Sequence, residues 1–141
     1  MASQLKVDTI TGVTTAGSVV VTGEAGSTTT NLQQGLTKVW HNFDGESTVA
    51  TRDSYNVSGL TDNQAGDFTF SYTNNMAGQN YTTQHQAQDV GALYLVPYIP
   101  ATANVATSSL RIYYGYANNT TGGIQRADHD LANFSHHGDL A

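Results

Sequence analysis

The chain contains no cysteine, only two prolines and only five basic side chains among its 141 residues. Without cysteine it cannot form a disulfide, bind zinc through thiolates or use a thiol nucleophile. Its net charge of −6 argues against nucleic-acid binding, because that function depends on a positively charged surface. We therefore expect no nucleic acid among its partners.

Long apolar runs are also missing. The longest one, Gly91–Ile99, has the length of a strand and falls short of the ~20 residues that a membrane-spanning helix needs. The N-terminus has neither a cationic start nor a hydrophobic segment, so we expect no signal peptide and no membrane insertion. If the protein works outside a cell, we expect another route of release, such as lysis.

Threonine, asparagine, serine, glutamine and glycine are abundant instead, together with 8 tyrosines and 4 phenylalanines. Charged residues make up 11% of the chain, whereas they make up about a quarter of an average soluble domain. Disordered chains are rich in Glu, Lys and Pro and poor in aromatic residues. The composition therefore favours a folded, β-rich protein with a surface of hydroxyls and amides.

Alternating apolar and polar residues predict a series of strands. The clearest is Asp67–Thr73, where Phe68, Phe70 and Tyr72 alternate with small polar residues. Further strands are expected at Thr37–Asp44, Ser54–Leu60, Asn80–Gln88, Ala92–Ile99, Ser108–Ala117 and Leu131–Phe134. Because turn-forming residues separate these short strands, we predict an all-β fold, an antiparallel, jelly-roll-like β-sandwich over residues 37–141.

In contrast to the predicted sandwich, residues 1–36 are interpreted as an N-terminal assembly or attachment arm. Leu5–Ile10 and Gly17–Thr22 are β-prone and predict a hairpin or β-arc, while Gly23–Leu36 reads as a linker. That linker has at most one helical turn, which Asn31 could cap and Gly35 could stop. A lone hairpin is marginal in water, so we expect other chains to complete the arm. The expected contact residues are Leu5, Val7, Ile10, Val19, Val20 and Val21.

Histidines near the C-terminus are candidate metal ligands: His129, His136 and His137. Zinc or iron would accept them together with the neighbouring aspartates. On a strand, however, His136 and His137 point to opposite faces and cannot reach the same ion. One histidine from each of three chains around a three-fold axis could. The favoured interpretation is a polar, turn-rich C-terminus with exposed histidines, so no metal and no other cofactor is predicted.

Three tyrosines, Tyr113, Tyr114 and Tyr116, lie within Leu110–Asn119 and cannot all face one side of a regular strand. Either at least one ring is exposed or packed on another chain, or the rings fill both faces of a sandwich strand. Exposed tyrosines suit surface recognition of protein or sugar, because the ring supplies area and the hydroxyl a hydrogen bond. Such recognition is expected within Gly91–Thr121.

No catalytic residue is predicted. The chain has no G-x-S-x-G motif between a strand and a helix, and its acidic residues lie mostly in turns. Aspartates in turns usually stabilise the turn by bonding their own backbone. We therefore expect a protein without enzymatic activity.

Three segments carry a resemblance to a known group of proteins. They are SQLKVDTITGVTTAGSVVVTGE with TTTNLQQGLTKVW, then DSYNVSGLTDNQAGDFTFSYTNNMAGQNYT, and finally HGDLA. Together they resemble structural proteins of marine tailed bacteriophages, small tail-fibre-like or virion-surface proteins of viruses of cyanobacteria and ocean bacteria. The resemblance covers nearly the whole chain, is strongest in Leu5–Trp40 and Asp53–Tyr81, and brings no catalytic motif.

The resemblance implies a location on the virion, at the surface of the capsid or the tail. It implies a non-enzymatic, homotrimeric surface appendage, either tail-fibre-like or a head fibre, that contacts the host cell. The alternative is a capsid decoration (cement) protein that stabilises the head shell. The implied partners are further copies of the chain, other capsid or tail proteins, and a host surface receptor.

Overall fold

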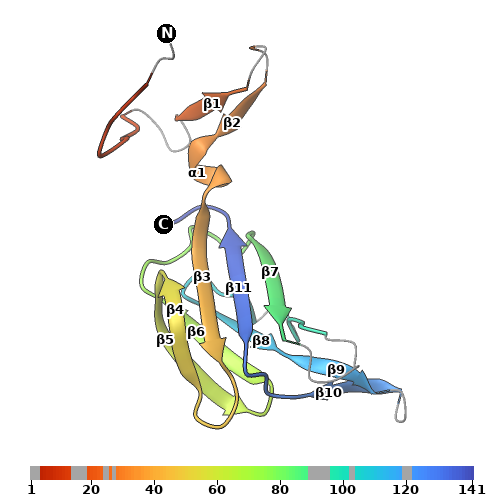
Figure 1. Cartoon of the computed structure of the whole chain (residues 1–141). Coiled ribbons are helices and arrows are strands. Elements are labelled where there is room, and N and C mark those ends of the chain that lie inside the picture. Colours follow the sequence, from red (N-terminus) through yellow and green to blue (C-terminus); the bar gives the residue numbers. More distant parts are fainter. Residues whose placement is uncertain are drawn as a thin grey trace. The chain divides into compact units, whose positions relative to one another are not determined.

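The computed structural model describes residues 4–13, 19–23, 26, 28–88, 96–101, 104–118 and 122–141. The chain divides into two compact units, Met1–Leu36 and Thr37–Ala141 (Figure 1). The described part of the chain contains eleven β-strands and one four-residue helix. The predicted all-β class is therefore confirmed.

The N-terminal unit contains one small antiparallel pair, β1 (Val20–Thr22) with β2 (Thr29–Asn31). Helix α1 (Leu32–Gly35) follows directly. The Asn31 side chain accepts a hydrogen bond of 2.9 Å from the Gln34 backbone N–H, so Asn31 caps the helix as expected.

The expected pairing within the arm was wrong. Leu5–Ile10 forms no strand, and Val20–Thr22 pairs instead with Thr29–Asn31, which lies inside the segment expected to be a linker. Gly26 helps to close this turn with a φ of +80°, a conformation that costs glycine little. Strand propensity alone did not make Leu5–Ile10 a strand, because propensity takes effect through packing against neighbours.

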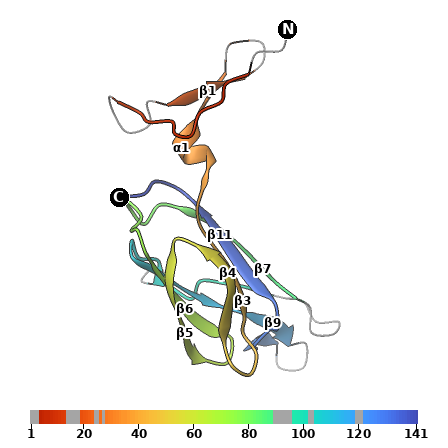
Figure 2. The same cartoon turned by 60° about the vertical axis from the view of Figure 1, so that its left-hand side comes forward.

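The C-terminal unit is built from two antiparallel sheets (Figures 1 and 2). The first sheet has the order β4-β3-β11-β7, formed by Ala50–Tyr55, Thr37–Asp44, Ala132–His137 and Thr82–Ala87. The second has the order β5-β6-β8, formed by Val57–Gln64, Asp67–Tyr72 and Ser109–Tyr113. A separate two-stranded ribbon pairs β9 (Gly115–Asn118) with β10 (Gly123–Arg126).

Aromatic and aliphatic side chains from the two sheets meet in one core. Phe70 of β6 lies 4.5 Å from Phe134 of β11 between ring centroids, and Phe43 of β3 lies 5.0 Å from Phe68 of β6. All four side chains are buried. The unit is thus sandwich-like, with its inner faces packed together.

Two expected strands proved to be pairs of strands. The segment Ser54–Leu60 is interrupted at Asn56, whose φ of +60° turns the chain from β4 into β5. Its side-chain oxygen accepts a 2.7 Å hydrogen bond from the Asn74 backbone N–H, which anchors this corner. The segment Ser108–Ala117 is interrupted at Tyr114, between β8 and β9.

The remaining strand predictions agree more closely. β3 has the predicted bounds, and in β6 the side chains of Phe68, Phe70 and Tyr72 are buried as the alternation required. Of the predicted strand Ala92–Ile99, residues 92–95 lie outside the described residues, and Tyr98 forms a bridge with Tyr113.

Candidate ligand-binding groove

The outer face of the first sheet carries a continuous set of polar side chains. On β3, Val39, His41 and Phe43 are buried in the core, so Trp40 and Asn42 face outward. The same alternation places further polar residues outward from the next two strands of the sheet, β11 and β7. They are Asn133 and Ser135 on β11 and Gln84 and Gln86 on β7.

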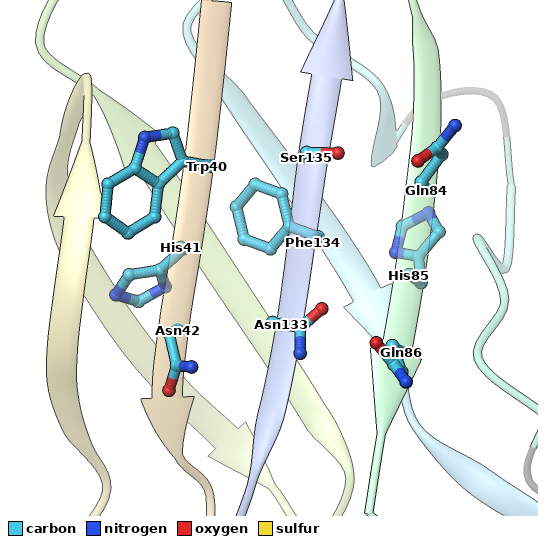
Figure 3. Close-up of a pocket in the computed structure, with 9 residues that line it drawn as sticks. All are labelled: Trp40, His41, Asn42, Gln84, His85, Gln86, Asn133, Phe134 and Ser135. Carbon is cyan, nitrogen blue, oxygen red and sulfur yellow. The ribbon is translucent and has the colours of Figure 1, made fainter. Parts of the chain in front are cut away.

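The strand register aligns these side chains in two rows. Asn133 pairs with Asn42 on one side and with Gln86 on the other, which places three amides side by side. Ser135 pairs in the same way with Trp40 and Gln84. Figure 3 shows the two rows, one above the other, across β3, β11 and β7.

The β4 strand extends both rows by one residue. Asp53 lies opposite Asn42, and Tyr55 lies opposite Trp40. The Tyr55 side chain is exposed, so a second aromatic ring borders the indole on this surface. The aromatic pair and the amides therefore lie on one face of one sheet.

This face is hollowed into an open groove of about 460 Å³. Its lining residues are Trp40, His41, Asn42, Gln84, His85, Gln86, Asn133, Phe134 and Ser135 (Figure 3). Pockets that bind small molecules span ~300–1,000 Å³. The groove is therefore large enough for a small ligand or for part of an extended one.

Among the described residues, the lining contains no aspartate, glutamate, lysine or arginine. The Asn42 side-chain oxygen is buried there and accepts no hydrogen bond from any of the described residues. An amide offers both a donor and an acceptor, so the row of amides can bind a neutral polar ligand through several hydrogen bonds.

Two histidines lie behind this groove, on the inner side of the sheet. Burial lowers the pKa of His41 and that of His85 from 6.5 to about 4. The His41 ring stacks on Phe43 at 5.3 Å, and its Nε2 shares a 2.9 Å hydrogen bond with the Thr51 hydroxyl. Both rings are therefore neutral near pH 7 and bring no charge to the groove.

The structure corrects the predicted recognition tyrosines in part. Tyr114 is 1% exposed and packs in the core, where its hydroxyl donates to the Asn133 carbonyl at 3.1 Å, so it is not a surface residue. Tyr113 is half-buried against Tyr98 and lies under the guanidinium groups of Arg111 and Arg126.

Tyr116 is half-buried and pairs with Gln125 in the β9–β10 ribbon. Residues 91–95, 102–103 and 119–121 of the expected recognition segment lie outside the described residues. The three tyrosines do not form a common exposed surface.

The expectation of exposed C-terminal histidines was wrong for two of the three. His129 and His136 are 1% and 0% exposed, while His137 is half-buried on the opposite face of β11. His136 shares a 3.1 Å hydrogen bond with the Tyr72 hydroxyl. Among the described residues, no group of three or more His, Cys, Asp or Glu side chains could hold a metal ion.

The expected contact residues of the arm lie mostly on the surface. Leu5, Val7, Ile10, Val20 and Val21 are each more than half exposed, and Val19 is half-buried. Sequence reasoning missed one residue of this set, Val13, which is 89% exposed.

Sequence reasoning also missed the groove. Its signal lay in TKVWHNFD, where Trp40 and Asn42 alternate with the core residues Val39, His41 and Phe43. Joining them to Gln84, Gln86 and Asn133 required the pairing of β3, β11 and β7, which are far apart in the sequence.

Comparisons of the chain with models of known protein families, with curated proteins and with solved structures gave no match. Within the described residues, no helix has the length and apolar character needed to cross a membrane.

Proposed function

We propose that the chain is a non-enzymatic structural protein of a tailed-phage virion. In this proposal it forms a β-rich homotrimeric appendage on the capsid or tail surface that contacts the host cell. The resemblance of its sequence suggests the virion, and one structural observation supports the assembly role. The N-terminal unit buries none of its described side chains and exposes apolar ones, with Leu5 at 81% and Val13 at 89%.

Exposed apolar side chains in so short an arm favour association with other chains. Burying a side chain such as Leu5 contributes ~1.5–3 kcal/mol, and three-fold symmetry repeats each contact three times. The β1–β2 pair also leaves strand edges to which another chain can add. A trimer formed through the arms would leave the sandwich unit of each copy free to carry the groove.

The charge distribution suits a surface that does not bind nucleic acid. Arg111 and Arg126 both pair with the buried Asp67, while Arg52 pairs with Asp44 and Asp130. These three guanidinium groups are thus held within the unit's own ion pairs.

A capsid decoration protein is the second candidate. The compact sandwich unit favours this role, since no repetitive shaft occurs within the described residues. The two candidates differ in position on the virion and in copy number.

Immunogold labelling of intact virions, with an antibody against the folded chain, tests the proposal. Gold over the tail, or at a few points on the head, supports an appendage. Gold spread evenly over the head supports the decoration role. Virions without gold, with the chain found only in infected-cell extracts, would contradict both.

A further inference from the structure

We propose that the groove on the outer face of the β4-β3-β11-β7 sheet binds a neutral saccharide. The binding residues are Trp40, Asn42, Gln84, Gln86, Asn133 and Ser135. The inference rests on the proposed function for its setting, because a host-contacting appendage would meet such a saccharide at the cell surface.

The indole of Trp40 supplies the apolar part of the site. One face of a pyranose ring presents C–H groups, which pack against an aromatic ring, while its hydroxyls point sideways. An aromatic side chain offers the matching flat area and has few torsions to immobilise. Tyr55 lies directly opposite Trp40 on β4, so the aromatic surface extends beyond one ring.

The amides supply the polar part. Asn42, Asn133 and Gln86 are neighbours across three strands, and neighbouring strands are about 4.8 Å apart. Each amide offers a donor and an acceptor, and each sugar hydroxyl can also act as both. A row of amides beside an aromatic ring therefore matches a ring edge that carries hydroxyls.

One acceptor of the amide row is unsatisfied. The Asn42 side-chain oxygen is buried in the groove, and none of the described residues donates a hydrogen bond to it. Buried polar atoms in proteins are nearly always hydrogen-bonded, so an ordered water or a hydroxyl of a bound molecule would complete this acceptor. A sugar hydroxyl is such a donor.

The charges in and around the groove select a neutral ligand. None of the nine described lining residues is charged near pH 7, and Asp53 lies beside the amide row on β4. An anionic saccharide would meet this carboxylate without a compensating cation in the lining. A cation would meet only one carboxylate, which is too few for a hard-metal site.

The chain carries its own reporter for this test, because Trp40 is its only tryptophan. Titrating the full chain with cellotetraose, maltotetraose and xylotetraose, and with tetragalacturonic acid as a charged counterpart, follows binding through Trp40 fluorescence. A neutral-glycan array probed with the labelled chain widens the set of sugars. We expect a saturable change with at least one neutral glycan and none with the uronic acid.

Two variants and a matched control locate the binding. Asn133→Ala and Gln86→Ala should each weaken the affinity for that glycan at least about tenfold, because each removes hydrogen-bonding groups from the row. Gln79→Ala removes an exposed amide from a loop outside the groove and should leave the affinity unchanged. Unchanged circular dichroism and melting temperature confirm that the variants fold.

The outcomes separate this inference from the proposed function. No binding by any neutral glycan, equal binding of the uronic acid, or full affinity in both groove variants would overturn the saccharide site. None of those results affects virion labelling. Conversely, unlabelled virions would reject the proposed function even if Trp40 fluorescence reported saturable binding of a neutral glycan.

Discussion

Three histidines show how individual side chains set the response of the protein to acid. His41, His85 and His136 lie on β3, β7 and β11, on the side of the sheet that faces the core. Burial is the main reason why the pKa of His136 falls from 6.5 to about 3; His85 and His137 lower it too, against a hydrogen bond with the Thr82 backbone that raises it. These rings therefore stay neutral in the folded protein near pH 7.

We predict that the free energy of unfolding falls as the pH drops from about 6.5 to about 4. The unfolded chain binds protons on these histidines near pH 6.5, whereas the folded chain resists them, so acid favours unfolding. For His41 alone the loss reaches about 3 kcal/mol, since one pKa unit is worth about 1.4 kcal/mol. Urea unfolding followed at several pH values in this window measures the slope.

Two variants assign this slope to the buried rings. His41→Phe should reduce the slope by the share of His41, because a Phe ring can pack against Phe43, Phe70 and Phe134 as the imidazole does and binds no proton. His137→Gln, on the outer face, should leave most of it. A stability that stays constant over this window in the wild type would contradict the prediction.

The buried carboxylate of Asp67 acts in a different pH range. Arg111 binds both oxygens, at 2.8 and 2.6 Å, and these hydrogen bonds are the main reason why the pKa of Asp67 lies below its usual range. The stability that this pair contributes is lost only when the pH falls below about 3.8. The histidine slope can therefore be measured without it.

At the scale of elements, the turn between β5 and β6 is hydrogen-bonded to the junction of β8 and β9. Gly66 has a φ of +64°, and its carbonyl accepts a 2.8 Å hydrogen bond from the Tyr114 N–H. Its own N–H donates to the Asp128 carboxylate at 2.7 Å. A side chain at this position would press against the Tyr114 carbonyl and the Ala127 backbone.

We predict that Gly66→Ala lowers the free energy of unfolding by about 2 kcal/mol or more, from the strained φ and the backbone clash together. Gly78→Ala is the matched control, because a Cβ there would meet no atom within 4 Å. Equal stability of the two variants in chemical denaturation would show that the turn does not pack as described.

The same scale shows what the sequence could predict. The bounds of β3 and the alternation of β6 followed from local pattern, because each strand has one buried face. The breaks at Asn56 and Tyr114 did not, since each depends on partners elsewhere: Asn74 for the first, Gly66 and Asn133 for the second.

The groove had the same limitation. The alternation around Trp40 could be read locally, but the amide row exists only because β11 lies between β3 and β7. The C-terminal histidines His129 and His136 were likewise expected to be exposed but are buried, because local sequence does not show the packing of His136 against Tyr81 and Phe134.

At the scale of the whole molecule, the two units differ in their surfaces. The arm exposes apolar side chains, which the proposed function assigns to assembly, and the sandwich presents a polar groove on one sheet. In a trimer, three grooves would act together, and linked sites bind a multivalent surface far more tightly than one site does.

Sedimentation equilibrium of the full chain tests the central claim, assembly through the arm, most directly. We predict a native mass three times the chain mass of 15.0 kDa. Replacing Leu5, Val7 and Ile10 together by serine should give a folded monomer. Ile124→Ser, which removes an exposed apolar side chain outside the arm, should remain trimeric. A monomeric full chain, or a trimer that survives the triple substitution, would contradict the claim.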